Sequence, residues 1–551
     1  MDTEPDDREK NTVTGSTQSI FSKSVTFFKN IRARKLKSLP AYDPAVHGPL
    51  IEYEVPEKYQ EIERYWVNEP YAFISIVQEK ETAHYYVVEP FLTAFEKEML
   101  ELVYDDLQDI LTLKDSSIGV TKEEVLIGKA LWLFDRYHAS LDVPGIHKIL
   151  YYLKRNYIGY GRIHPLTLDQ HIEDISCDGV GIPIFLYHSK YRDIETNISF
   201  WETELNSFVI KLCQRGGKYI SLGEPMVDAT MPDGSRLQAT LGKEVTTRGS
   251  SFTIRKFKSD PITPIDLISF NTCNTKMLAY FWFAIENKRS ILFAGGTASG
   301  KTSMLNASSL FIPPLSKVVS IEDTREITLH HDNWVAGLTR ESFIFGGTGE
   351  VSMYDLLRAN LRQRPEYIIV GEVRGKEALT LFQAMSTGHT TYSTMHAGDV
   401  QTVVTRLENE PINVPHIMMQ SLDILCIQIH TFVHDDRVRR TQSVVEVTGL
   451  DPKTGNIRIN ELFYWDPATD LFRHAGESHV LNSIMQSRGW NTERLNTELD
   501  NRQRVLDYMV EKKMRDYITV SLVVQAYSTN PRNVLKAIDD NTLTELILQS
   551  A

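Results

Sequence analysis

The chain has 551 residues, of which 42% are hydrophobic and 24% are charged, and its formal net charge is −13. This balance is typical of a globular protein with several domains and excludes a largely disordered one. The acidic excess argues against a surface built mainly to hold nucleic acid, and the four cysteines are too widely spaced to suggest a zinc site or a disulfide framework.

The N-terminus and the apolar runs of the chain indicate where in the cell the protein is expected. The N-terminus is polar and acidic, unlike a secretory signal. No apolar run approaches the roughly 18 residues that a membrane-spanning helix needs. We therefore expect a soluble, cytoplasmic protein that could still dock on a membrane.

Residues 1–46 are expected to form a disordered arm that is basic in its second half. Between positions 21 and 39, six cationic residues alternate with apolar ones: Lys23, Lys29, Arg32, Arg34, Lys35 and Lys37 with Phe21, Phe27, Phe28, Ile31 and Leu36. Such a segment can lie on a membrane or on an acidic partner. A solvated flexible arm is the commoner outcome for a block of charge.

Two α/β segments are predicted before the first clear linker. Residues 47–145 form an adapter domain, with strands near 71–77 and 84–88 and capping boxes that begin at Thr93 and Thr121. Residues 146–256 form a second domain, with helices at 146–157 and 202–215 and a tight hairpin at Asp233-Gly234. The segment 257–264 contains two prolines and is predicted to be a linker.

From residue 265 to 551 we expect an α/β domain with a doubly wound parallel sheet, followed by hairpins and helices. Strands are predicted at 290–294, 317–321, 367–370 and 391–395, and helices at 303–310, 354–363 and 376–387. Strands that alternate with helices are typical of that fold. Two hairpins are predicted to turn at 451–455 and 466–470, and the tail from 478 is predicted to be helical.

A phosphate-binding loop follows the first of these strands. Every fixed position of the pattern is filled, and the residues expected to contact a nucleotide are Gly295, Gly296, Thr297, Ala298, Ser299, Gly300, Lys301, Thr302 and Ser303. Backbone N–H groups of such a loop and the helix that follows hold the charge of a polyphosphate. Lys301 is expected to contact the β- and γ-phosphates, and the Thr302 hydroxyl to bind Mg²⁺.

Acidic residues and histidines follow neighbouring strands. Glu322, Asp323 and Glu326 follow one strand and Glu372 another, so they should lie on the same edge of the sheet as the loop. For Glu322 and Asp323 the alternative is that each only caps the next element. His389 and His396 flank a further strand, where they either sense a γ-phosphate or are structural.

Together these four segments resemble the secretion ATPases of type II secretion, type IV pili and the archaellum. They correspond to the family's Walker A loop, its acidic box, its Walker B strand and its histidine box, in the family's order. Residues 172–187 and 231–256 resemble the archaeal branch, and the absence of a four-cysteine cluster agrees with that branch. The resemblance implies a RecA-like motor domain preceded by α/β N-terminal domains.

The resemblance also implies roles, cofactors and partners. Glu326 matches the general base, Glu372 matches the Walker B acid that holds Mg²⁺ through water, and both histidines match the histidine box. It implies ATP and Mg²⁺ as cofactors, a homohexamer, and a polytopic platform protein at the inner face of the cell membrane. Catalytic arginines would come from the N-terminal domain, with Arg236, Arg248 and Arg255 as candidates, or from Arg362 and Arg364.

Three functions remain open at this point. An ATP-driven assembly or secretion motor is favoured by the resemblance. A DNA-transfer or translocase ATPase on the same core is disfavoured by the net charge. A nucleotide-gated scaffold without hydrolysis is disfavoured because it would not need both acidic segments.

Overall fold

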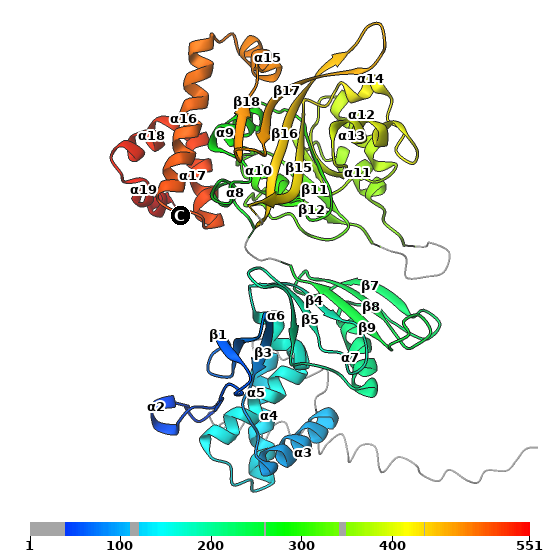
Figure 1. Ribbon diagram of the computed structural model, residues 1–551, viewed down its shortest axis with the longest axis vertical. Coiled ribbons are helices and arrows are strands. Elements are labelled where there is room, and N and C mark those ends of the chain that lie inside the picture. Colours follow the sequence, from blue (N-terminus) through cyan, green and yellow to red (C-terminus); the bar gives the residue numbers. More distant parts are fainter. Residues whose placement is uncertain (1–38, 111–120, 258–260, 341–348, 435, 551) are drawn as a thin grey trace, which may run out of the picture. The chain divides into compact units, whose positions relative to one another are not determined.

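The computed structural model describes residues 39–110, 121–257, 261–340, 349–434 and 436–550, and the chain divides into two compact units, 1–257 and 258–551 (Figure 1). The predicted basic segment lies outside the described residues, apart from Leu39. The short helix α2, Pro44–His47, overlaps the end of the predicted arm.

Unit 1 contains a nine-stranded sheet in the order β1-β2-β3-β6-β5-β4-β9-β8-β7. Its strands are β1 Gln60–Asn68, β2 Ala72–Glu79, β3 Thr82–Val88, β4 Ile172–Cys177, β5 Phe185–His188, β6 Arg192–Thr196, β7 Met226–Thr230, β8 Arg236–Thr240 and β9 Ser251–Arg255. A short parallel pairing between β3 and β6 joins the two halves of the sheet. One sheet therefore includes strands from both predicted N-terminal segments.

The helices of unit 1 form two groups. Helices α3 Ala94–Ile110, α4 Lys122–Arg136 and α5 Val143–Tyr157 share a core of their own, while α6 His164–Leu168 and α7 Glu202–Arg215 belong with the sheet. Both predicted capping boxes are formed. The Thr121 side chain accepts from Glu124 N while Glu124 accepts from the Thr121 backbone, and Thr93 and Glu96 make the same exchange. These reciprocal bonds define where α3 and α4 begin.

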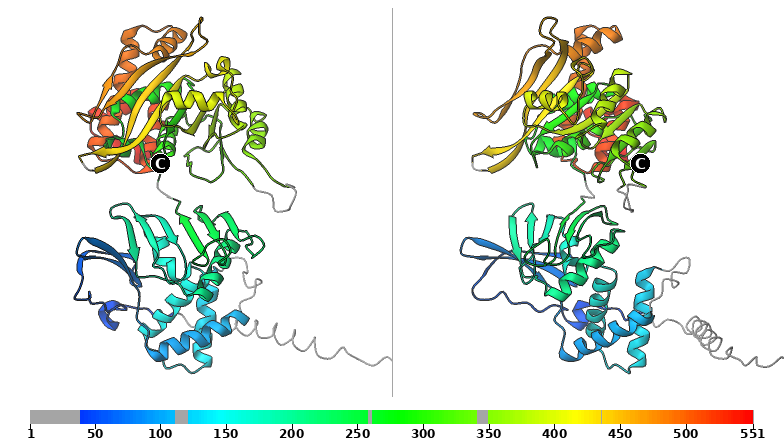
Figure 2. Two further views of the ribbon diagram at one scale, coloured as in Figure 1. Left: turned by 45° about the vertical axis from the view of Figure 1, so that its right-hand side comes forward. Right: turned by 90° about the vertical axis from the view of Figure 1, so that its right-hand side faces the viewer.

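Unit 2 contains a second nine-stranded sheet, in the order β12-β11-β13-β14-β10-β15-β16-β17-β18. Its strands are β10 Ile291–Gly295, β11 Val318–Glu322, β12 Trp334–Leu338, β13 Tyr367–Val370, β14 Thr390–His396, β15 Ile424–Val433, β16 Asp436–Leu450, β17 Ile457–Asp466 and β18 Leu471–His474. Neighbours from β12 to β15 pair in parallel, and the rest pair antiparallel. Figure 2 shows the long strands β15, β16 and β17 along one side of the unit.

Alternate residues of the parallel strands enter two separate cores. Phe293 packs with the core that includes helices α9 and α16, and Leu292 and Ala294 pack with the core that includes α12 and α13. A strand buried on both faces is apolar throughout, as the sequence of β10 is. The helices are α8 Pro264–Ser269, α9 Thr275–Glu286, α10 Lys301–Ser309, α11 Met353–Leu361, α12 Glu377–Ser386, α13 Val400–Glu408, α14 His416–Met419, α15 His479–Arg488, α16 Thr492–Glu511, α17 Tyr517–Thr529, α18 Pro531–Asp539 and α19 Leu543–Ser550. This is the doubly wound, RecA-like arrangement that the sequence predicts.

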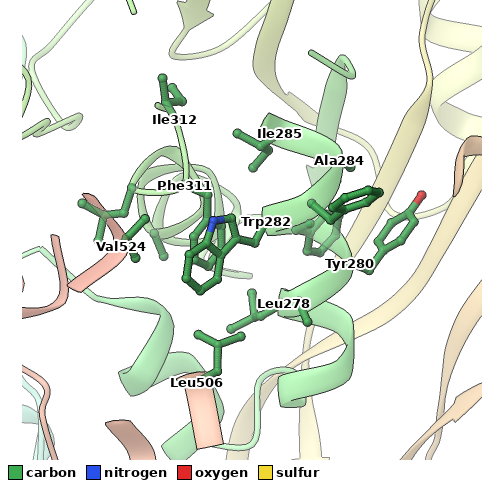
Figure 3. Packing of buried hydrophobic residues seen from close by; sticks show 14 of the residues in the cluster. Leu278, Tyr280, Trp282, Ala284, Ile285, Phe311, Ile312, Leu506 and Val524 are labelled. Atoms are coloured by element: carbon green, nitrogen blue, oxygen red, sulfur yellow. The ribbon is translucent and has the colours of Figure 1, made fainter. Parts of the chain in front are cut away.

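Helix α9 is the centre of the larger core. Trp282 is fully buried, stacks on Phe311 with ring centroids 5.1 Å apart, and meets the Tyr527 ring edge-on at 5.0 Å. Figure 3 shows Trp282 among Phe311, Leu506 and Val524. The C-terminal helices thus pack on α9 and α8 through α16, and they cover the sheet on the side away from α11–α14 (Figure 1).

Candidate functional site

The phosphate loop lies between β10 and α10. Gly295 ends the strand, and a Cβ atom there would lie 2.3 Å from the Gln428 carbonyl oxygen of β15, so only glycine fits. Gly300 has φ 93° and directly precedes the helix. Ala298 also has a positive φ, 56°, which is uncommon for a residue with a side chain. The loop therefore has the shape that brings backbone N–H groups to one point at the start of α10.

Lys301 lies at the centre of the loop. Its side chain is buried, and Nζ donates to the Gly296 carbonyl at 2.8 Å and lies 3.5 Å from His396 Nδ1. Ser299 Oγ donates to the same Gly296 carbonyl at 2.9 Å. A bound phosphate would compete with this carbonyl for the Lys301 ammonium group.

Glu372 and His396 lie at the same edge of the sheet as Lys301. His396 is the register partner of Gly295, and Glu372 follows β13 by two residues. His396 Nε2 is 3.2 Å from Glu372 Oε1, and the Arg374 guanidinium donates to the other oxygen of Glu372. Burial lowers the pKa of His396, and the Lys301 ammonium lowers it further. A neutral imidazole can therefore connect the lysine to the acid.

The second acidic segment is held by Glu322. This residue ends β11, is 2% exposed, and its Oε1 accepts from the backbone N–H groups of Glu326 and Ile327 at 2.8 and 2.9 Å. Its Oε2 is buried and has no partner among the described residues. Burial raises the pKa of Glu322 to about 7. Glu322 therefore caps no helix, because the next element is the strand β12; it instead fixes the backbone of the loop at Glu326.

The loop that carries Glu326 is also tied to the phosphate-loop helix. Thr328 N donates to the Asn306 side chain of α10 at 3.1 Å. The Glu326 side chain is half-buried, and the loop leaves β11 at the carboxyl edge of the sheet. Both acidic segments therefore lie at the edge that carries Lys301.

The residues at this edge carry the groups that a nucleotide with Mg²⁺ would contact. Thr302 is half-buried in the first turn of α10, so its hydroxyl belongs to the loop's own helix start. A pocket of about 250 Å³ lies beside Glu372, and no residue of the phosphate loop lines it; its lining residues are Asp323, Met353, Glu372, Arg374, Gly375 and Glu377. Hydroxyl and carboxylate oxygens are the ligands that Mg²⁺ prefers.

Comparison with known protein families and with individual proteins shows which family this architecture matches. Residues 219–507 match the model of the type II/IV secretion system protein family, and residues 19–91 match the PilB3-like N-terminal model. The uncharacterised protein MJ0900 of Methanocaldococcus jannaschii is 36% identical over 492 residues, which cover 84% of this chain and 88% of that protein.

The chain belongs to the type II/IV secretion system protein family.

Two further relatives extend the comparison. The uncharacterised protein MJ1287 of the same organism is 47% identical over 45% of this chain and 92% of its own length. The conjugal transfer protein TrbB of Rhizobium radiobacter is 30% identical over 41% of this chain and 68% of its own length. Within the described ranges, no helix of this family member is long and apolar enough to cross a membrane.

The expectation that both histidines lie near the phosphate loop needs a correction for His389. His389 directly precedes β14, whereas His396 ends it. The strand runs parallel to β10, so its two ends lie at opposite edges of the sheet. His389 Nδ1 instead lies 3.3 Å from the Ala384 carbonyl at the end of α12. Arg362 caps the end of α11 and Arg364 lies three residues before β13, so both lie on the side where β13 begins, at the edge of the sheet opposite the phosphate loop.

The three candidate arginines of unit 1 do not lie together. Arg236 and Arg255 are direct register partners on β8 and β9. Arg248 lies in the loop that joins the other ends of these strands, where its carbonyl accepts from Val180 N at 3.0 Å. Among the described residues neither Arg236 nor Arg255 forms a salt bridge.

Two further residues of the unit 2 site were not singled out by the sequence. Arg374, which contacts Glu372 and lies 3.9 Å from Asp323, could have been found from its place two residues after the Walker B acid. Arg439 of β16 donates to the Ala298 carbonyl at 2.8 Å. No local pattern indicates Arg439, because strand pairing brings it to the loop.

Proposed function

We propose that this family member is an ATPase that hydrolyses Mg²⁺-ATP at the phosphate loop and drives assembly or secretion by a type IV pilus-like, type II secretion or archaellum system. The observation that carries the proposal is the series of contacts from Lys301 through His396 to Glu372 at one edge of the sheet. A buried lysine and an acid beside a phosphate loop are groups that phosphoryl transfer in such enzymes uses, and here an imidazole connects them.

In this proposal each group has a distinct role. Lys301 and the loop N–H groups hold the β- and γ-phosphates, and Glu326 accepts a proton from the attacking water. Thr302 and, through water, Glu372 would hold Mg²⁺, which neutralises phosphate charge when bound. His396 senses the terminal phosphate through its contacts with Lys301 and Glu372.

We further propose that the protein works as a homohexamer on a polytopic platform protein at the cytoplasmic face of the membrane. Residues 47–145 would serve as the adapter, 146–256 as the second N-terminal domain, and 257–264 as a hinge. The division of the chain after Phe257 supports a hinge there. The match of residues 19–91 to the PilB3-like N-terminal model favours a pilus-like machine.

A DNA-transfer ATPase is the second candidate, favoured by the similarity to the conjugal transfer protein TrbB. The net charge of −13 speaks against it. DNA should stimulate hydrolysis in a salt-dependent manner if this alternative holds, because phosphate contacts release counterions. Turnover that is indifferent to DNA but stimulated by vesicles containing the platform protein would favour the first candidate.

The deciding experiment compares the turnover of Lys301→Ala with that of the unaltered protein in Mg²⁺-ATP. We expect Lys301→Ala to abolish turnover, because no other ammonium group among the described contacts of the loop takes its place. Lys276→Ala, which removes an exposed lysine of α9 in the same unit, should leave turnover unchanged. Undiminished hydrolysis by Lys301→Ala would remove the basis of the assignment.

A further inference from the structure

Arg439 reaches the phosphate loop from a strand far away in the sequence. β15 pairs in parallel with β10, and β16 pairs antiparallel with β15. This places the Arg439 side chain against the loop, where Nε donates to the Ala298 carbonyl at 2.8 Å and Cδ lies 3.4 Å from the point where a Cβ of Gly300 would be. The arginine therefore packs across the outer turn of the loop.

The carbonyl that Arg439 holds belongs to a strained residue. Ala298 has φ 56°, and a residue with a side chain is strained in this region and stays there only when its surroundings hold it. A hydrogen bond from a charged donor is stronger than one from a neutral donor. The Arg439 contact thus helps to keep the loop in the conformation that presents its N–H groups.

The backbone of Arg439 is itself fixed. The next residue, Arg440, is buried, and its Nη1 donates to the Arg439 carbonyl at 3.0 Å and to the Phe270 carbonyl at 3.1 Å. Arg440 also forms two hydrogen bonds with Asp470, at 2.7 and 2.9 Å. This network presents Arg439 to the loop from a rigid support.

The charge of Arg439 is not neutralised by a carboxylate. Among the described residues it forms no salt bridge, in contrast to Arg440 beside it. Its guanidinium therefore adds positive charge beside Lys301, whereas the guanidinium of Arg374 at the same edge is paired with Glu372. Arginine keeps this charge at any ordinary pH and offers several donors in one plane.

We propose that Arg439 is a positioning residue of the nucleotide site, which holds the outer turn of the phosphate loop in its phosphate-binding shape and adds a second positive charge beside a bound polyphosphate. The inference rests on the proposed function of the loop. It concerns a residue on an antiparallel strand, outside all four sequence segments that carry the resemblance.

The test measures the dissociation constant of a fluorescent ATP analogue with Mg²⁺ on the full chain. Arg439→Ala should weaken binding about 10- to 100-fold, the usual range for loss of a hydrogen bond to a charged group. The dissociation constant of Arg439→Lys should lie between those of Arg439→Ala and the unaltered protein, because lysine keeps the charge without the planar set of donors. Arg437→Ala is the matched control, since Arg437 is exposed on the same strand and lies over the Phe432 ring, and it should bind within about twofold of the unaltered protein.

Salt dependence separates a positioning role from general damage to the fold. Binding to Arg439→Ala should decline less steeply with salt than binding to the unaltered protein, because one cation near the phosphates is gone. Affinities of Arg439→Ala and Arg439→Lys equal to that of Arg437→Ala would overturn the inference. Unimpaired binding by Lys301→Ala would instead overturn the function proposed for the loop.

Discussion

The Glu322 carboxyl group meets two different surroundings. Oε1 accepts hydrogen bonds from two backbone N–H groups, while Oε2 is buried and has no hydrogen-bond partner among the described residues. Burial raises the pKa from its ordinary 4.5 to about 7. The folded protein then holds the proton of Glu322 more tightly than the unfolded chain does. The protonated carboxyl group therefore stabilises the folded state relative to the ionised one. This contribution is complete below pH 4.5 and is lost as the pH rises through about 7.

Glu322→Gln should remove this pH dependence. The amide keeps an acceptor for both backbone N–H groups and never ionises. We expect the free energy of unfolding of Glu322→Gln, relative to the unaltered protein, to rise by up to about 3 kcal/mol as the pH increases from 4.5 to about 7. Denaturant unfolding of both proteins at a series of pH values measures this difference in the free energy of unfolding. Glu461→Gln, at an exposed position of β17, should show no such trend, and a flat difference for Glu322→Gln would contradict the prediction.

For single residues, the sequence predicts those that belong to a contiguous motif well. It predicts poorly those that reach the site from a part of the chain far away in the sequence. The phosphate loop is local, and its residues lie where the pattern places them. His389 was misplaced because six residues of β14 lie between the two histidines, which is enough to cross the sheet. Arg439 could not be found, because its contact with Ala298 depends on the pairing of three strands.

Helix α9 is the element on which the C-terminal helices depend. Trp282 contacts Phe311 from the end of α10 and Tyr527 from α17, and the Arg502 guanidinium of α16 lies 5.8 Å from its ring centroid. Trp282→Ala should therefore lower the free energy of unfolding by about 3–5 kcal/mol, the usual cost of removing a large buried aromatic side chain. Denaturant unfolding followed by circular dichroism measures the loss.

The control for this change is Trp201→Ala. Trp201 precedes α7 and is 73% exposed, so its removal should change the free energy of unfolding by less than about 0.5 kcal/mol. Equal effects of the two substitutions would show that burial of α9 does not hold the C-terminal helices in place.

The sequence predicts the elements whose apolar or turn-forming residues follow a clear pattern. It does not predict the strands that are recognised only by the strands they pair with. Helix α7 has the predicted bounds, and the hairpins of β16–β17 and β17–β18 turn where Asp, Pro and Gly indicate. The edge strand β12 was missed, because it is short and half-exposed and so lacks a continuous apolar run. The β15–β16 pairing was also missed, since β16 begins with the charged residues Asp436, Arg437, Arg439 and Arg440.

At the scale of the whole molecule, the opposed pair Arg236 and Arg255 of unit 1 is a candidate source of positive charge for hydrolysis, and this role can be tested. Like charges at directly opposite positions of antiparallel strands destabilise a sheet. If the pair has only a structural role, replacing one arginine should change stability and leave turnover unaffected. If the pair supplies positive charge to a nucleotide in the hexamer, the same replacement should relieve repulsion and slow hydrolysis.

We expect the second outcome. Arg236→Gln should leave the free energy of unfolding unchanged or raise it by up to about 1 kcal/mol, because the repulsion is removed while Arg255 keeps Asp174 of β4 directly opposite it. Its turnover should fall about 10³-fold, at the lower end of what an arginine contributes to phosphoryl transfer. Arg136→Gln is the control, since Arg136 is an exposed arginine at the end of α4 in the same unit and is not one of the candidate catalytic arginines. Turnover and binding of a fluorescent ATP analogue are measured together. Loss of turnover with binding retained assigns the pair to catalysis, whereas full turnover by Arg255→Gln and Arg236→Gln would leave catalysis to groups of unit 2 alone.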